Sequence, residues 1–407
     1  MSTLTDLFAH RRLPRAVGRL TLFGASAAVL LTGMIAALPF TMQREYTFPA
    51  PRPFVGPALY NPYAAASGTW FRVNFHAHAH AWWGLTDGHQ PDADVIRHYR
   101  QLGYDVAALS NYEHISRGLG SDSLSLPVYE HGYNMDKVHQ LVIGARRVEW
   151  FDFPWHQSLA DKQYVLDLLH GSGELVAVAH PELHERRGGT DFRYLTNYDL
   201  MEVRTHSGVA TAEWDTALTT GHAVWALADD DTHDVTDTAD TGHSWNMVNA
   251  ASLRPADIIA ALRVGHTYGV EGDHSGSDVR LASLVLRGDT LVVKCVGVPA
   301  RFTFIGAGGV VLATVAHADT ARFVMPADAP YVRTEVTSAR ATLYLNPVVR
   351  YDGVALARLA AVPVDHAPGQ LAGLIALAVL MPTYIVWRRQ RRRQAALVTA
   401  AEADAAA

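Results

Sequence analysis

The segment Asn74-Phe-His-Ala-His-Ala-His80 carries three histidines at alternate positions. Alternate residues of a β-strand point to the same face, so a strand here would place His76, His78 and His80 on one side. Two imidazoles separated by one residue on one face can bind a single metal ion. A solvated strand edge would show the same pattern, so this motif alone leaves both interpretations open.

Further ligand-type side chains stand at or near the ends of apolar runs that are typical of buried strands. They are Glu149, His180, Asp231 and His233, together with Asp87 in a Thr-Asp-Gly turn and His156 after a Phe-Asp-Phe-Pro-Trp stretch. Strand ends are where α/β barrels carry their active sites. Each residue alone could be a surface acid or a buried histidine with a partner, but their repetition at successive strand ends favours a metal centre.

The elements that must position these residues change in character along the chain. From about Thr69 to Val270, short apolar runs alternate with amphipathic helical stretches, which favours a parallel α/β sheet or barrel. After Gly276 the runs become short and β-rich, separated mostly by Gly, Asp or Pro, which predicts a small β-sandwich. This sandwich would either cover one side of the barrel or bind carbohydrate.

Two uncharged apolar stretches, 20–40 and 370–387, predict helices that cross a membrane, because about 20 apolar residues span the hydrocarbon core. Arginines precede the first stretch and follow the second, which predicts that both termini are cytoplasmic and that the rest is outside. We therefore expect a bacterial inner-membrane protein with a periplasmic catalytic domain. A cleaved signal peptide is the alternative for the first stretch, and a buried helix is the alternative for the second.

Composition excludes several classes of protein. The formal net charge of −6 gives no sign of a basic surface for nucleic acid. A single cysteine, Cys295, excludes a disulfide framework and cysteine-based zinc sites, whereas 21 histidines make nitrogen ligands abundant. The chain has no Gly-x-Ser-x-Gly elbow, no P-loop and no candidate catalytic cysteine, so a protein nucleophile is not expected.

The order of these motifs resembles that of the PHP (polymerase and histidinol phosphatase) superfamily, over roughly Thr69 to Val270. The matching residues are His76 and His78 of the opening His-x-His, Asp87 of Thr-Asp-Gly, Glu149 as the bridging glutamate, His180 of Ala-His-Pro, and Asp231 with His233 of the closing Asp-x-His; His156 lies near a further family histidine. The resemblance implies a distorted (β/α)7 barrel, two or three divalent metal ions (Zn, Mn or Fe) and phosphoester hydrolysis.

The resemblance also assigns the ligands. It gives one metal to His76, His78, Glu149 and Asp231, a second, bridged by Glu149, to His180 and His156, and a third to Asp87 and His233. At the third site this chain departs from the family pattern, because Ser110-Asn-Tyr112 stands where the family has Thr-Asp-His. Either His114 replaces the missing ligand from a shifted turn, or the third site is weakened.

The resulting organisation has eight parts. They are a cytoplasmic N-terminus (1–19), a transmembrane helix (20–40), a Pro-rich linker (41–68), a PHP-like hydrolase domain (69–276), a β-sandwich (277–353), a linker (354–369), a second transmembrane helix (370–387) and a basic, alanine-rich cytoplasmic tail (388–407).

The function expected from the sequence is that of a membrane-anchored, extracytoplasmic phosphoesterase that uses a metal-activated hydroxide. Its expected catalytic residues are Glu149, Asp231 and Arg204, with Arg204 as the cation for the phosphate and Arg117 or Arg147 as alternatives. A catalytically impaired metal-binding sensor or ligand-binding module is the alternative, and non-phosphate hydrolysis by the same metals is a third.

The expected partners are the lipid bilayer and a small-molecule or envelope phosphoester, without nucleic acid, while the oligomeric state stays open. Aromatic residues stand beside the expected ligands: Trp82, Trp83, Trp150, Trp155 and Tyr112. They would either form a rim that suits a sugar or a base, or pack against the barrel mouth.

Overall fold

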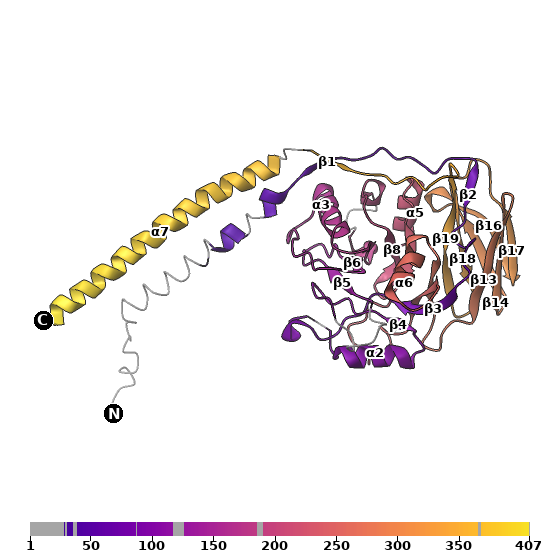
Figure 1. Cartoon of the computed structure of the whole chain (residues 1–407), viewed down its shortest axis with the longest axis horizontal. Helices are drawn as coiled ribbons and strands as arrows, with labels where there is room; N and C mark the ends of the chain where they lie inside the picture. The colour runs from indigo at the N-terminus through magenta and orange to yellow at the C-terminus, as the bar shows by residue number, and fades with distance from the viewer. Residues whose placement is uncertain are drawn as a thin grey trace, which may run out of the picture. The chain divides into compact units, whose positions relative to one another are not determined.

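The computed structural model of the 407-residue chain describes residues 28, 31–35, 39–86, 88–116, 126–184, 190–364 and 368–406. The chain divides into two units (Figure 1). The first, Tyr46–Val362, contains nearly all strands and helices, and the second is contributed by both terminal segments. Asp87, Arg117 and most of the apolar stretch 20–40 lie outside the described residues.

A six-stranded sheet forms one half of the α/β part, in the order β10-β8-β7-β6-β5 with β9 paired to β8. Its strands are β5 (Val128–His131), β6 (Gln140–Ile143), β7 (Leu175–Val178), β8 (Leu200–Thr205), β9 (Gly208–Val209) and β10 (Trp225–Ala228). β7, β8 and β10 are parallel, whereas β6 runs antiparallel to both β5 and β7. Nearly all residues of the five longer strands are buried, as is typical of a sheet covered on both faces.

The helices connect or flank these strands. They are α2 (Asp92–Gln101), α3 (Leu159–His170), α4 (Pro181–His184), α5 (Thr211–Thr219) and α6 (Pro255–Arg263), with the 3-10 helices η1 (Pro39–Met42), η2 (Trp82–Gly84), η3 (Asp191–Arg193) and η4 (Ala307–Gly309). The start of α3 is fixed by a capping box, in which Ser158 accepts from the Asp161 backbone N–H and Asp161 accepts from that of Ser158. The start of α6 is favoured by Pro255 in its first turn.

A nine-stranded sheet runs through both the α/β part and the β-rich part, in the order β16-β15-β18-β19-β12-β11-β3-β4 with β2 paired to β19. Its strands are β2 (Ala58–Tyr60), β3 (Thr69–Asn74), β4 (Val106–Ala107), β11 (Ser244–Ala250), β12 (Thr267–Glu271), β15 (Ala300–Ile305), β16 (Val311–Ala318), β18 (Tyr331–Thr337) and β19 (Thr342–Tyr351). The boundary expected at 276/277 falls after β12, and the sheet continues across it through β19.

A three-stranded sheet, β13 (Val279–Arg287), β14 (Thr290–Gly297) and β17 (Thr320–Val324), packs on the β-rich end of the nine-stranded sheet (Figure 1). The core between these two layers includes Leu284, Leu291 and Val293 from one side and Phe302 and Leu343 from the other. A separate two-stranded sheet joins β1 (Glu45–Thr47) to β20 (Val362–Val364).

The prediction of a (β/α)7 barrel is wrong, because the described strands form separate mixed sheets that do not close. β3, which leads to His76, pairs with the antiparallel strand β11 in the nine-stranded sheet, whereas β10, which leads to Asp231, is an edge of the six-stranded sheet. A single bridge, Ala77 with Thr232, links the segments that follow β3 and β10. Alternating strands and helices predicted the local elements but could not show which strands would pair.

The prediction of flanking transmembrane helices is also wrong, and the inner-membrane localisation that depended on it falls with it. Within the described part of the chain, no helix is both long and apolar enough to cross a membrane. α7 (Pro368–Ala406) is long, but its apolar stretch contains Pro382 and runs into a cluster of arginines from Arg388 onwards.

The β-rich part is joined to α5 by a buried ion pair, in which Arg333 donates from Nε and Nη2 to the two carboxylate oxygens of Asp215, each at 2.7 Å. Removing one partner leaves an uncompensated buried charge. We expect Arg333→Ala to lower the free energy of unfolding by about 3–5 kcal/mol in urea titrations. Arg301→Ala, at an exposed position of β15, should change it by less than about 0.5 kcal/mol, and equal effects would contradict this role.

His222 predicts a pH effect on stability, because burial lowers its pKa to about 4. Its pKa in the unfolded chain is higher, so the unfolded state binds more protons between pH 6.5 and pH 4, and stability falls as the pH drops through this window. The expected loss between pH 7 and pH 5 is about 2 kcal/mol. The His222→Gln variant should lose less over this range in urea titrations than the matched variant of exposed His170.

Candidate metal centre

Six buried ligand-type side chains meet where strands of the two sheets end. His76 and His78 follow β3, Glu130 lies in β5, His139 precedes β6, His180 follows β7, and Asp231 follows β10. They form two groups, and within each group the candidate ligand atoms all lie within 4.8 Å of one another. Glu130 belongs to both groups.

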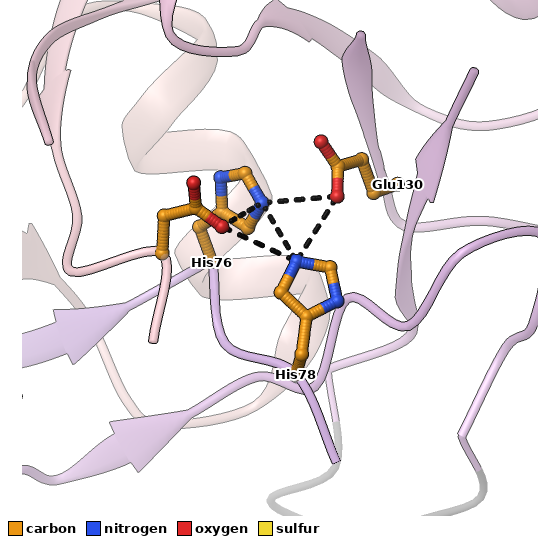
Figure 2. Close-up of side chains that lie close together, drawn as sticks. His76, His78 and Glu130 are labelled. Atoms are coloured by element: carbon orange, nitrogen blue, oxygen red, sulfur yellow. Dashed lines mark hydrogen bonds and ion pairs between the residues drawn. The ribbon is translucent and has the colours of Figure 1, made fainter. Parts of the chain in front are cut away.

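The first cluster consists of His76, His78, Glu130 and Asp231. Figure 2 shows His76, His78 and Glu130 pointing toward one another. The Nε2 atoms of the two imidazoles are 3.2 Å apart, and Oε2 of Glu130 lies 3.2 Å from His76 and 3.0 Å from His78. Oδ1 of Asp231 lies 3.0 Å from His76 Nε2 and 3.2 Å from His78 Nε2.

These separations fit a metal ion. Ligand atoms held tetrahedrally at about 2.0 Å from zinc lie about 3.3 Å from one another, close to the separations observed. Glu130 Oε2 and Asp231 Oδ1 are also buried without a donor in hydrogen-bond geometry among the described residues. Buried carboxylate oxygens without a donor are costly unless a cation binds them, so the first cluster is suited to a divalent ion.

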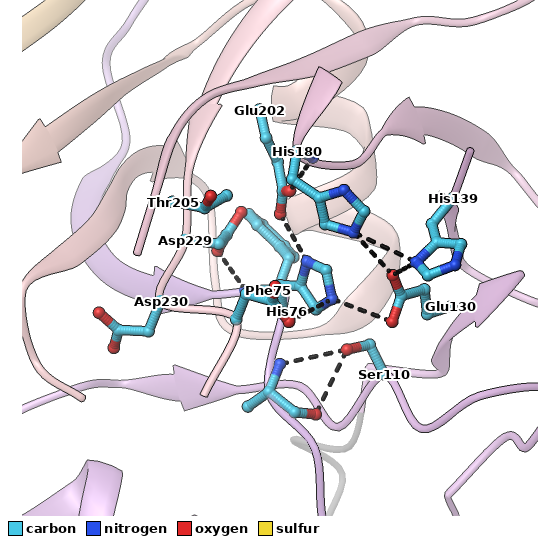
Figure 3. A network of polar contacts seen from close by, with 12 residues as sticks. Phe75, His76, Ser110, Glu130, His139, His180, Glu202, Thr205, Asp229 and Asp230 are labelled. Carbon is cyan, nitrogen blue, oxygen red and sulfur yellow. Dashed lines mark hydrogen bonds and ion pairs between the residues drawn. The ribbon is translucent and has the colours of Figure 1, made fainter. Parts of the chain in front are cut away.

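The second cluster consists of Glu130, His139 and His180 (Figure 3). Oε1 of Glu130 lies 2.8 Å from His139 Nδ1 and 3.1 Å from His180 Nε2, and the two ring nitrogens are 3.3 Å apart. Glu130 thus directs one carboxylate oxygen into each cluster. A set of three protein ligands is the arrangement that leaves a coordination position open for water or substrate in catalytic metal sites.

The electrostatics of the first cluster favour positive charge at its centre. Burial disfavours protonation of His76, but the carboxylates of Asp231, Glu202 and Glu130 outweigh it and hold the pKa of the ring well above its usual value. At His78, burial again disfavours protonation, but Asp231 and Glu130 outweigh it and raise the pKa to about 8. Burial would raise the pKa of Glu130, yet the neighbouring imidazoles hold it well below its usual value. A divalent cation supplies the positive charge that this environment stabilises.

Buried polar groups fix the segment that carries His76 and His78. The Ala77 backbone N–H donates to Ser110 Oγ at 3.1 Å, and the Ala79 N–H donates to Asn111 Oδ1 at 2.7 Å. Two ligands are themselves in the left-handed region, His180 with φ 27° and Asp231 with φ 53°. Residues other than glycine rarely adopt this backbone conformation, and such strained residues are concentrated at functional sites.

Glu202 of β8 holds one ligand from each cluster (Figure 3). Its Oε1 lies 2.9 Å from His76 Nδ1, and its Oε2 accepts from the His180 backbone N–H at 2.8 Å. A carboxylate on the far nitrogen of a ligating histidine fixes the ring orientation and leaves Nε2 free for the metal. Glu202 is fully buried, so it acts through these two contacts rather than through solvent.

The structure brings together four of the residues singled out from the sequence: His76, His78, His180 and Asp231. It does not bring Glu149 or His156 into either cluster. Glu149 Oε1 accepts from the Phe151 N–H at 3.3 Å, and His156 is exposed with its Nδ1 2.6 Å from Asp136.

Three expected ligands remain, which are His233, His114 and Asp87. The ring of His233 stacks on that of His78, with centroids 4.2 Å apart, and its Nδ1 lies 3.1 Å from the Asp231 carbonyl oxygen. His114 is exposed and packs edge-on to Trp82. Asp87 lies outside the described residues.

Arg204 forms an ion pair with Glu271, in which Nε of the arginine lies 3.0 Å from Oε1 of the glutamate. It lines a cavity of about 140 Å³ together with Asp230 and His206. The Nδ1 atom of His206 lies 3.8 Å from Asp231 Oδ2, so this cavity adjoins the first cluster.

Sequence reasoning missed Glu130, His139 and Glu202. Glu130 stands in Pro127-Val-Tyr-Glu-His131, a short strand that the alternation of longer apolar runs did not reveal. The signal available in the sequence was a glutamate within a short apolar run. The structure shows that this glutamate is fully buried, which is rare for a glutamate without a partner. Its antiparallel partner β6 begins next to His139, so recognition of this hairpin would have found both residues.

These features define a chain of mixed sheets and helices with two adjoining buried clusters suited to divalent metal ions. No family model and no curated protein sequence matches the chain. Among solved structures, it is similar to a two-domain protein from Bacteroides vulgatus described as containing a predicted PHP-like metal-dependent phosphoesterase. The two share 10% sequence identity, the match covers 78% of this chain and 99% of that chain, and the TM-score is 0.40. A likeness this distant carries no argument about this chain.

The contacts of Glu202 give a prediction about metal affinity. Glu202→Gln keeps the side-chain shape but removes the charge that orients His76, so we expect divalent metal to bind about 10–100-fold more weakly. Competition against a fluorescent chelator measures this affinity. Glu213→Gln, in α5 and outside both clusters, is the matched control, and unchanged affinity in Glu202→Gln would remove Glu202 from the site.

Proposed function

We propose that this chain is a metal-dependent hydrolase that acts on phosphoesters and holds two divalent ions on clusters that share Glu130. The observation that carries the proposal is this shared carboxylate, which directs Oε2 to one histidine pair and Oε1 to another. A structural zinc site needs only one closed set of ligands, whereas a bridged pair with a three-ligand member is typical of hydrolytic centres.

The bound ions would supply Lewis acidity, charge neutralisation and a water of lowered pKa. The chain's own residues hold and orient them. His76, His78 and Asp231 complete the first site, His139 and His180 complete the second, and Glu202 fixes the His76 ring. The nitrogen-rich ligand set suits zinc, manganese or iron.

Groups beside the clusters are placed to contact the substrate. Tyr112 packs against His78, with ring centroids 4.6 Å apart, and against His139, with centroids 5.5 Å apart, so it lies beside both clusters. The cavity next to Asp231 is lined by Arg204 and His206. Asp230, Asp240 and Glu271 also line it and oppose the binding of an anion there. Glu271 partly neutralises Arg204, so we assign the main stabilisation of phosphoryl charge to the ions.

The test compares Glu130→Gln with Glu149→Gln in the full-length chain, purified without chelator. We expect about two ions per chain by elemental analysis in the wild type and in Glu149→Gln. Glu130→Gln should lose at least one ion and on the order of a hundredfold or more in hydrolysis of an aryl phosphate, because it removes the carboxylate charge shared by the two sites and replaces one ligand oxygen with an amide nitrogen.

Loss of metal and activity in Glu149→Gln, with both retained in Glu130→Gln, would return the bridging role to Glu149. Two tightly bound ions without turnover on a broad panel of phosphoesters would instead identify a metal-binding module. A folded chain that takes up no divalent ion would rule out the proposed hydrolase.

A further inference from the structure

An aromatic surface extends outward from the first metal cluster. It consists of Tyr112, Trp82, Trp83 and Trp150, which we call the aromatic platform. Tyr112 stacks on His78 with an interplanar angle of 24°, and its backbone carbonyl accepts from Trp82 Nε1 at 2.8 Å. The platform therefore begins in contact with a metal ligand.

The indole of Trp82 is the centre of the platform. Its ring centroid lies 5.7 Å from that of Trp150 and 6.4 Å from that of Trp83, with interplanar angles of 69° and 67°. Both contacts are edge-on, so the neighbouring rings leave flat faces uncovered. Three segments far apart in sequence, around residues 82, 112 and 150, thus place aromatic rings on one surface.

Packing does not account for this surface. Trp83 is 91% exposed and Trp150 is 58% exposed, whereas tryptophan is normally well buried and stabilises a fold through the area it hides from water. Exposed apolar groups gathered in one patch are typical of binding surfaces.

The backbone under the platform is also unusual. Trp82 and Trp83 have φ values of 52° and 57°, in the left-handed region that bulky side chains avoid. Consecutive residues in this conformation are held only where surrounding contacts determine them, and the Trp82 hydrogen bond to Tyr112 is one such contact.

We infer that the aromatic platform binds a ring in the leaving group of the substrate through one face of that ring, which belongs either to a nucleobase or to a sugar. This inference rests on the proposed function. In the hydrolysis, a water oxygen bonds to phosphorus, the bond from phosphorus to the leaving oxygen breaks, and the ring-bearing alcohol takes up a proton. We assign the platform no step in bond making, and its role is to position the leaving group through contacts with the ring faces. A nucleobase would stack by its π face and a sugar would pack by its C–H face.

The test measures kcat and KM for three phosphomonoesters with the metal-loaded, full-length chain. They are a nucleoside monophosphate, a hexose phosphate and glycerol phosphate, of which the last has no ring. In Trp83→Ala and Trp150→Ala we expect KM for at least one ring-bearing ester to rise about tenfold more than KM for glycerol phosphate. The ester that shows the rise identifies the ring. Val354→Ala, an exposed apolar residue outside the platform, should match the wild type.

A second measurement separates the platform from catalysis. Isothermal titration calorimetry with the same compounds reports binding without turnover, and Glu130→Gln can be used for it. If no ester is hydrolysed but ring-bearing compounds bind and the platform variants abolish this binding, the proposed function fails and the platform stands. If both variants bind and hydrolyse all three esters as Val354→Ala does, the platform is overturned.

Discussion

The structure depends on keeping one carboxylate, Glu130, ionised in a place with no access to water. An isolated buried carboxylate would cost several kcal/mol, so charge must be supplied around it. The imidazoles of His76 and His78 approach one of its oxygens, and those of His139 and His180 approach the other. Glu130 lies in β5, and the histidines stand directly before or after β3, β6 and β7. The two sheets must therefore present the ends of these strands to a single point.

The three consecutive aspartates after β10 have three different structural roles. Asp229 Oδ1 accepts from the Phe75 N–H at 2.6 Å and so fixes the residue next to His76. Asp230 accepts from the backbone N–H groups of Gly242, His243 and Ser244 and thereby holds the loop that follows. Of the three, Asp231 alone belongs to the metal cluster, and it is also the one with a left-handed backbone, at φ 53°. Three identical side chains in a row thus have three different sets of partners.

The sequence was informative where local chemistry decides the outcome. His76 and His78 were recognisable from alternate spacing, and His180 and Asp231 from their places after apolar runs. Glu130 and His139 were not, because they belong to a short antiparallel hairpin inside a series read as parallel. The prediction of a barrel was wrong for a related reason, because strand pairing is a long-range property that apolar periodicity does not encode. The prediction of membrane-spanning helices was wrong because an apolar run with flanking arginines is compatible with more than one kind of helix.

The continuous nine-stranded sheet has a consequence for how this molecule tolerates change. β3, which leads directly to the first two histidines, and β18, which lies in the β-rich part, belong to one sheet and are connected through β11, β12 and β19 by antiparallel pairing. A chain ended after β12 would leave that strand with an unpaired edge, which is a template for intermolecular association. The β-rich part therefore protects the edge of β12 from intermolecular pairing. Its own register shifts, in β15/β16 and β18/β19, stay local, since the pairing of β12, β11 and β3 is regular.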